Sequence, residues 1–88
     1  MAEFSYDVAV IGGGVTGEGV LDACLDALRP GGRLVANAVT VEGEAVLAAA
    51  HARLGGTLTR LSVARAGAVG GFTGWRPAMP VTIWSVTP

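Results

Sequence analysis

The sequence predicts an α/β fold with the element order βαβαββ, in which the last two strands form a C-terminal antiparallel hairpin. Residues 33–39 are apolar at both odd and even positions, which is typical of a strand covered on both faces of a sheet. Apolar residues with helical spacing precede and follow this strand. The last two strand-like segments, residues 57–66 and 81–86, have no crossover helix between them, so we expect them to pair antiparallel.

The first half of the chain supplies a strand, a helix and the central strand. Residues 6–11 form a short apolar run that ends in Gly12-Gly13-Gly14. Helical spacing then relates Val20, Leu21, Cys24, Leu25 and Leu28. The segment Pro30-Gly31-Gly32 predicts a turn, because proline cannot continue a helix and glycine tolerates positive φ. The strand at residues 33–39 follows this turn and is expected to lie in the middle of the sheet.

A second helix is predicted after the central strand. Thr40 is a suitable N-cap, and Glu42 and Glu44 follow in the first turn, where acids complement the helix dipole. Gly55 and Gly56 end the helix. His51, the only histidine, lies near this C-terminal end, where a surface or packing role is favoured over a catalytic one.

The end of the chain predicts strands separated by a loop. Residues 57–66 alternate in part, as a half-exposed strand does. Residues 67–80 are rich in glycine and predict a long loop that carries Trp75 and Arg76. Residues 81–86 form the last strand. With no internal repeat and no linker, residues 1–88 are predicted to form a single α/β domain.

Composition narrows the class of protein. Hydrophobic residues make up 51% of the chain and charged residues only 15%, so a domain of this size is expected to expose apolar surface and to self-associate. A net charge of −1 gives no electrostatic reason to expect nucleic acid or an anionic membrane as partner. Cys24 is the only cysteine, which excludes an intrachain disulfide. One histidine and one cysteine form no metal site. These features predict a cytoplasmic protein.

Residues 12–17 satisfy the pattern GxGxxG directly after a predicted strand. Glycines in this position let the backbone approach a pyrophosphate, so the motif is compatible with a dinucleotide-binding module for FAD or NAD. Such sites also need an acidic residue at the end of the next strand. Asn37 occupies that place here, which weakens the dinucleotide hypothesis without removing it.

Four longer segments carry a family resemblance: IGGG (residues 11–14), LRPGGRLVANAVTVEGE (28–44), GGTLTRLSVARA (55–66) and GGFTGWRPAMPVTIWSV (70–86). Together they resemble the C-terminal half of the decarboxylating precorrin-6Y methyltransferase domain of cobalamin biosynthesis. The resemblance implies a partial Rossmann-like sheet of the S-adenosylmethionine-dependent methyltransferases. In that fold, residues 6–11 correspond to strand four, residues 33–39 to strand five, and the last two strands to the terminal hairpin.

The family pattern also includes segments that this sequence does not match. Members have a first strand with a glycine-rich cradle for the cofactor and a second strand ending in an acid. The resemblance therefore implies a truncated domain, with residues 12–88 as its methyltransferase-like half and residues 1–11 as a vector-derived, grafted or divergent leader. We expect such a chain to bind no S-adenosylmethionine and to be inactive alone, although the parent family methylates a precorrin.

The resemblance suggests site residues within the methyltransferase-like half, residues 12–88. Gly12, Gly13 and Gly14 would form a floor near the cofactor, or only a tight turn. Asn37 would bind a substrate group, or only cap the second helix. Arg76 would pair with tetrapyrrole carboxylates, or only hold its own loop. No catalytic residue is identified.

Self-association is expected for two reasons. Residues 6–11 would leave an open strand edge, and related enzymes form tetramers through the terminal hairpin. The sequence thus predicts a homodimer or homotetramer. A non-catalytic, self-associating or engineered hybrid remains a further hypothesis beside the methyltransferase and the dinucleotide module.

Overall fold

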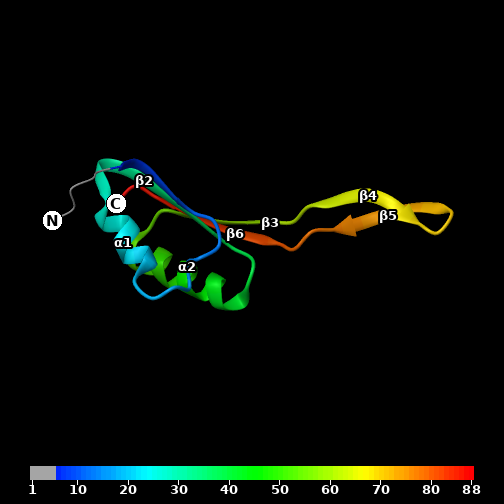
Figure 1. The fold of residues 1–88 in the computed structure, drawn as a ribbon, viewed down its shortest axis with the longest axis horizontal. Helices are drawn as coiled ribbons and strands as arrows, with labels where there is room; N and C mark the ends of the chain where they lie inside the picture. Colours follow the sequence, from blue (N-terminus) through cyan, green and yellow to red (C-terminus); the bar gives the residue numbers. More distant parts are fainter. Residues whose placement is uncertain (1–5) are drawn as a thin grey trace.

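The computed structural model describes residues 6–88, and the proposed leader residues 1–5 lie outside the described part. Eight elements follow one another along the chain (Figure 1). They are β1 (Tyr6–Ile11), α1 (Val20–Asp26), β2 (Leu28–Ala38), α2 (Val41–Leu54), β3 (Thr57–Leu61), β4 (Ala64–Val69), β5 (Phe72–Pro77) and β6 (Val81–Val86).

Four strands form one mixed sheet in the order β1-β2-β6-β3. β1 and β2 are parallel and are connected through α1, whereas β6 runs antiparallel to both of its neighbours, β2 and β3. The α/β class is confirmed, and so is the inner position of the strand that contains residues 33–39. Within the described residues β1 is an edge strand, as the sequence predicted.

The turn predicted at residues 30–32 lies inside β2 rather than before it. The pairing of β1 with β2 shifts between Tyr6↔Leu28 and Val8↔Arg33, so β2 accommodates extra residues in an irregularity of the ladder. Gly31 has a φ of 82° there, a conformation that favours glycine. The strand thus begins earlier than expected, with the turn absorbed as a bulge.

Both helices lie on one side of the sheet (Figure 1). Trp84, Leu34 and Leu47 have the largest fully buried side chains, and they join β6, β2 and α2 in one core. The indole Nε1 of Trp84 donates a hydrogen bond to the carbonyl oxygen of Gly55, at 2.8 Å. This bond connects the middle of β6 to the end of α2 and satisfies the one polar atom of the buried ring.

The predicted ends of α2 are confirmed. The Thr40 hydroxyl accepts a hydrogen bond from the backbone N–H of Gly43 at 3.0 Å, which is an N-cap interaction. At the other end, Gly55 has a φ of 74° and Gly56 a φ of 86°. A Cβ at Gly56 would lie 2.4 Å from the Ser85 carbonyl oxygen, so backbone conformation and close packing both require glycine at this position.

The loop predicted at residues 67–80 is wrong, because this segment forms a two-stranded antiparallel hairpin of β4 and β5. Gly70 and Gly71 make the connecting turn, with a φ of 58° at Gly70. The single strand predicted at residues 57–66 is likewise divided, since β3 ends at Leu61 and β4 begins at Ala64. We call residues 62–80 the arm and the remaining described residues the body.

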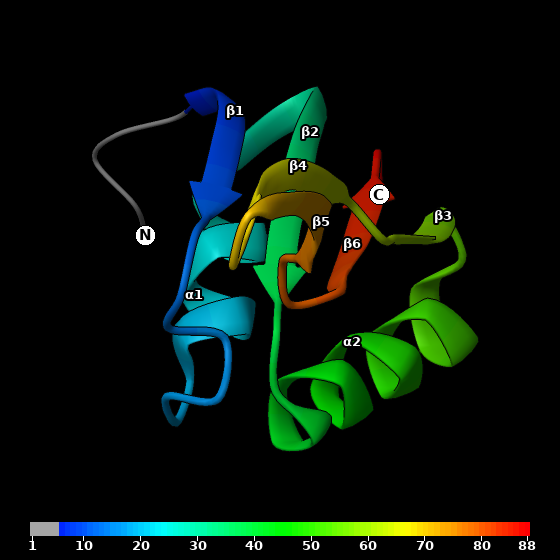
Figure 2. The same cartoon turned by 90° about the vertical axis from the view of Figure 1, so that its right-hand side faces the viewer.

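The arm projects far from the body (Figure 1), and Figure 2 looks along it from its tip. The molecule measures 60 × 22 × 21 Å, and its Cα radius of gyration is 16.3 Å. A compact domain of this length would have a radius of gyration of about 12 Å. The arm therefore contributes little to the core and presents most of its surface outward. Within residues 6–88, no helix has both the length and the apolar character needed to cross a membrane.

Candidate functional site

The carboxyl ends of the parallel strands meet at one edge of the sheet, where α/β proteins bind ligands. β1 ends at Ile11 and β2 at Ala38, and a recess of about 140 Å³ lies beside these ends. We call it the edge recess. Its lining residues come from the glycine turn, the end of β2 and the start of α2: Gly12, Gly13, Val15, Thr16, Asn37, Ala38, Val39, Thr40 and Gly43.

The glycine turn that follows β1 is exposed. A Cβ added at Gly12, Gly13 or Gly14 would meet no atom within 4 Å, and none of the three has a positive φ. Neither backbone conformation nor packing within this chain therefore requires glycine at these positions. Gly12 and Gly13 line the edge recess, whereas Gly14 is not among its lining residues.

Asn37 is half-buried near the end of β2 and also lines the edge recess. Leu34, Ala36 and Ala38 are buried beneath the helices, so strand alternation places Asn37 on the opposite face. The alternative role as a helix cap is wrong, because Thr40 caps α2. The structure thus brings Asn37 to the same recess as Gly12 and Gly13.

Arg76 lies on β5 in the arm and does not line the edge recess. Its Nη2 donates a hydrogen bond to the carbonyl oxygen of Ala68 at 2.7 Å. A Cβ at Gly67 would lie 2.5 Å from the Arg76 Nε, so the side chain runs along the arm over this glycine. Arg76 is therefore held by its own hairpin, as one of the two sequence hypotheses expected, and its exposed side chain keeps further N–H groups free.

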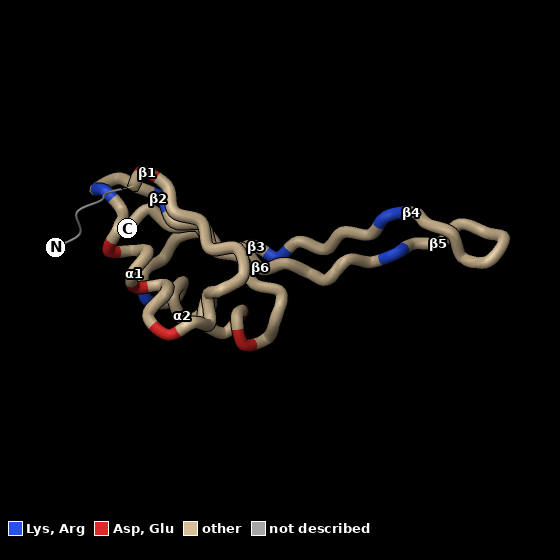
Figure 3. The backbone as a smooth tube through the Cα atoms, viewed as in Figure 1, with Lys and Arg blue, Asp and Glu red and all other residues tan. Residues whose placement is uncertain are grey.

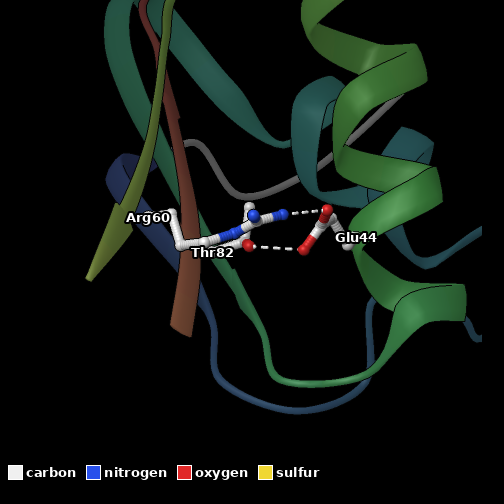
Figure 4. A network of polar contacts seen from close by, with 3 residues as sticks. All are labelled: Glu44, Arg60 and Thr82. Atoms are coloured by element: carbon white, nitrogen blue, oxygen red, sulfur yellow. Dashed lines mark hydrogen bonds and ion pairs between the residues drawn. The ribbon is translucent and has the colours of Figure 1, made fainter. Parts of the chain in front are cut away.

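A polar network connects α2 to the sheet near the same edge (Figure 4). One carboxylate oxygen of Glu44 accepts a hydrogen bond from Arg60 on β3, and the other accepts from the Thr82 hydroxyl on β6 at 3.0 Å. Thr82 is only 5% exposed, so Glu44 satisfies a buried hydroxyl. From the local sequence Glu44 is recognisable only as a first-turn acid, because its partners lie 16 and 38 residues away along the chain.

Replacing Glu44 with alanine is expected to destabilise the body by about 1–3 kcal/mol, because the buried Thr82 hydroxyl then loses its acceptor. The exposed Arg60 contact adds about 1 kcal/mol at most. Urea unfolding followed by circular dichroism measures the change. Glu42→Ala is the matched control, since Glu42 is an exposed acid of the same helical turn. Equal midpoints for the two variants would contradict the role assigned to Glu44.

No group of three or more His, Cys, Asp or Glu residues that could hold a metal ion occurs among residues 6–88. Another recess, with a volume of about 440 Å³, lies between the two helices, and the ion-paired Arg53 and Asp22 are among its lining residues. It is lined by helix surface rather than by strand ends, so the edge recess is the better candidate site.

The fold is that of an α/β protein. Its glycine turn and Asn37 lie at the carboxyl ends of the parallel strands, where α/β proteins bind ligands. The model of the precorrin methyltransferase domain matches residues 3–88. The chain therefore belongs to the precorrin methyltransferase domain family.

Individual relatives agree with this assignment. The chain is 62% identical over 81 residues to a decarboxylating precorrin-6Y C(5,15)-methyltransferase of Sinorhizobium sp, and 62% identical over 80 residues to one of Mycobacterium tuberculosis. It covers 20% of each of these proteins, and these matches span 92% and 91% of the chain.

Solved structures show the same relationship. A precorrin-6Y C5,15-methyltransferase domain from Corynebacterium diphtheriae matches with a TM-score of 0.90 and 45% identity, over 97% of this chain and 50% of that one. The C-terminal domain of a precorrin-6Y C5,15-methyltransferase from Rhodobacter capsulatus matches with a TM-score of 0.81 and 42% identity, over 90% and 42% of the two chains. The chain thus spans half of the first domain and less of the second.

The described residues do not enclose a ligand of the size of S-adenosylmethionine, the cofactor that the sequence resemblance leads us to expect. Pockets for ligands of that size measure roughly 300–1,000 Å³, whereas the edge recess measures about 140 Å³. The glycine turn and Asn37 provide one side of a site but no opposing wall. We therefore derive no step of methyl transfer from these residues.

Proposed function

We propose that the chain forms one half of an S-adenosylmethionine-dependent methyltransferase domain that acts on a precorrin, the activity named by its relatives. The observation that carries the proposal is the glycine turn. Gly12 and Gly13 line the edge recess, yet nothing within this chain requires glycine there. Close approach of a ligand explains the missing side chains, because any Cβ would occupy the open side of the recess.

The proposed roles follow from position. Gly12, Gly13 and Gly14 form a floor beneath the cofactor and the reacting end of the substrate. Asn37 lies at the strand end, where its amide can donate to or accept from a polar group of either molecule. Arg76 carries a guanidinium that suits a substrate carboxylate. Methyl transfer depends mostly on holding donor and acceptor in line, so these residues are assigned to positioning and none to catalysis.

The 88 residues by themselves are proposed to bind no S-adenosylmethionine. The edge recess is too small to enclose it, and half of the Corynebacterium diphtheriae domain has no counterpart in this chain. In the parent fold a further strand lies next to strand four, which corresponds to β1. β1 pairs with β2 alone among the described strands, which agrees with a strand edge that the rest of such a domain would cover.

The proposal is tested by calorimetry with S-adenosylmethionine. The 88-residue chain alone is expected to give no binding heat. Mixed with the part of the Corynebacterium diphtheriae domain that has no counterpart here, it is expected to bind with micromolar affinity. The matched control is the same mixture with Gly13→Val, which should lose that affinity because the side chain enters the edge recess. Micromolar binding by the chain alone, or none by the mixture, would count against the proposal.

The dinucleotide alternative has no observation in its favour. Residues 12–19 separate β1 from α1, so the glycine turn does not lead directly into a helix. The helix that follows has seven residues, and its N-cap Gly19 makes no side-chain capping bond. Asn37 remains where an acid would be needed for the ribose. An unchanged melting temperature in NAD or FAD is the expected result, because a ligand of the native state would raise it.

A homodimer or homotetramer is proposed as the assembly, with the cytoplasm as its location. Large apolar side chains are exposed both on the edge strand and on the arm: Tyr6, Val8 and Val10 on β1, and Val69, Phe72, Trp75 and Met79 on the arm. Burial of such surface between copies is favourable by about 25 cal/mol per Å².

A further inference from the structure

The segment between β1 and α1, residues 12–19, has a single buried side chain. Val15 is 5% exposed and belongs to the core of the body, whereas the other seven residues of the segment are exposed. Five of the eight residues are glycines, and glycine loses more conformational freedom on folding than any other residue. Such a segment stays mobile unless contacts with the rest of the protein fix it.

Polar contacts do not fix this segment to the elements behind it. The N–H of Gly17 donates to the Gly14 carbonyl at 3.0 Å, and the N–H of Val20 donates to the Gly17 carbonyl at 3.2 Å. Both bonds only close turns along the chain. Apart from the strand ladder, no hydrogen bond among the described residues connects residues 13–18 to β2 or α2. Residues 12–17 are uncharged, so ion pairs do not hold the glycine turn either (Figure 3).

The Val15 side chain packs against the first turn of α2, at the buried residue Gly43. A Cβ on Gly43 would lie 3.5 Å from Cγ1 of Val15 and only 2.8 Å from the Cβ of Ala38. A side chain at position 43 would therefore force α2 away from the end of β2 and from Val15. Glycine inside a helix lowers the stability of that helix, and this close approach explains why α2 has glycine here.

The contact of Val15 lies close to the residues that line the edge recess. Ile11, the last residue of β1, is 6% exposed, so two buried residues four positions apart enclose the three glycines. Val15 itself lines the edge recess together with Gly12 and Gly13. Without the contact of Val15, the segment would be anchored at Ile11 and then only where α1 begins.

We propose that Val15 is a positioning residue of the methyltransferase site, an inference that rests on the proposed function. By packing on Gly43 it keeps the backbone of Gly12 and Gly13 at the open side of the edge recess, where the ligand approaches. A β-branched side chain suits this role, because its χ1 angle has few populated rotamers. A turn that is already ordered binds a ligand more tightly, since binding then causes no further loss of conformational entropy.

The first test measures backbone order parameters of the 88-residue chain by NMR relaxation. Gly12 and Gly13 are expected to be near the rigid value of about 0.85 in the original chain and below about 0.6 in Val15→Ala. Val86→Ala makes the same truncation at a position of β6 that is 3% exposed, and it should leave both glycines rigid. Val15→Ile keeps the β-branched contact and should also leave them rigid.

The second test repeats the calorimetry of the mixed halves with these variants. Val15→Ala is expected to weaken S-adenosylmethionine binding about 10-fold, a change of about 1.4 kcal/mol, whereas Val86→Ala and Val15→Ile should stay within about twofold of the original. Circular dichroism verifies the fold of each variant. If Val15→Ala does not fold, Val15→Thr, which keeps the branched shape but loses one methyl group, replaces it in both tests with the same expected direction.

Three results would overturn the proposal. They are mobile glycines in the original chain, equal order parameters at Gly12 and Gly13 in Val15→Ala and Val86→Ala, and equal affinities of these two variants in a mixture that does bind S-adenosylmethionine. A mixture of the original chain that binds none would instead count against the proposed function. The order parameters would still decide whether Val15 holds the glycine turn, so the two failures are distinguishable.

Discussion

Replacement of Trp84 with alanine is expected to unfold most of the protein at room temperature. Trp84 is fully buried in the middle of β6, where it pairs with Ala36 on one side and Leu58 on the other. Truncation of a buried tryptophan costs roughly 3–5 kcal/mol, and it also leaves the Gly55 carbonyl without its donor. Domains of this size have little stability in reserve, so the loss is comparable with the total.

Trp75→Ala is the matched control for Trp84→Ala. Trp75 is 75% exposed on the arm, so its truncation should change the free energy of unfolding by less than about 0.5 kcal/mol. Urea titration followed by far-ultraviolet circular dichroism measures both variants. A native-like spectrum for Trp84→Ala without urea, with a midpoint equal to that of Trp75→Ala, would show that the core does not depend on this indole.

The second large expected effect is on the molecular mass of the protein in solution. Light scattering at micromolar concentration is expected to give at least twice the 8.8 kDa of one chain. The reason is that β1 presents an open edge with Val8 and Val10 exposed, while the arm exposes Phe72 and Trp75. An unpaired apolar strand edge promotes pairing with another strand, and the closed symmetric outcome is a dimer or a tetramer.

Two variants test whether the β1 edge strand or the arm is the surface through which copies associate. Val10→Lys places a charge on the edge strand, and Phe72→Ser removes the ring at the tip of the arm. The variant that returns the mass to 8.8 kDa identifies the surface that associates. Val41→Lys is the control, since Val41 is 81% exposed at the start of α2 and should leave the mass unchanged. A stable monomer of the original chain would refute self-association altogether.

The local sequence was sufficient to predict the elements of the body and most of its edge recess. A strand that is apolar at odd and even positions favours an inner place in the sheet, and residues 33–39 do lie between β1 and β6. The expected cover on both faces is wrong for the described residues, because both helices lie on one side and Val35 and Asn37 on the other face are only half-buried. Thr40 and Gly55 mark the ends of α2 through interactions within a few residues of each other. Asn37 and the glycine turn were expected at one edge because parallel strands end there together, and Gly12, Gly13 and Asn37 do share the recess.

Only the tertiary structure revealed the arm. Glycine at residues 67, 70, 71 and 74 removes the contrast between apolar and polar positions by which a strand is recognised, so the segment resembled a loop. Its strand character arises from cross-strand hydrogen bonds once the Gly70–Gly71 turn closes. Counting outward from that turn would have placed Arg65 opposite Arg76, but only after the hairpin itself was recognised.

Tertiary structure also decided which distant residues meet. Glu44 contacts Arg60 and Thr82, which lie 16 and 38 positions away along the chain. The insertion of β6 between β2 and β3 joins residues that are further apart still, such as Leu34 and Val86. Register between strands depends on packing of the whole sheet and not on local propensity. For the same reason Arg76, assigned to the site from sequence, lies on an arm beyond the edge recess, because the hairpin carries it away from the strand ends.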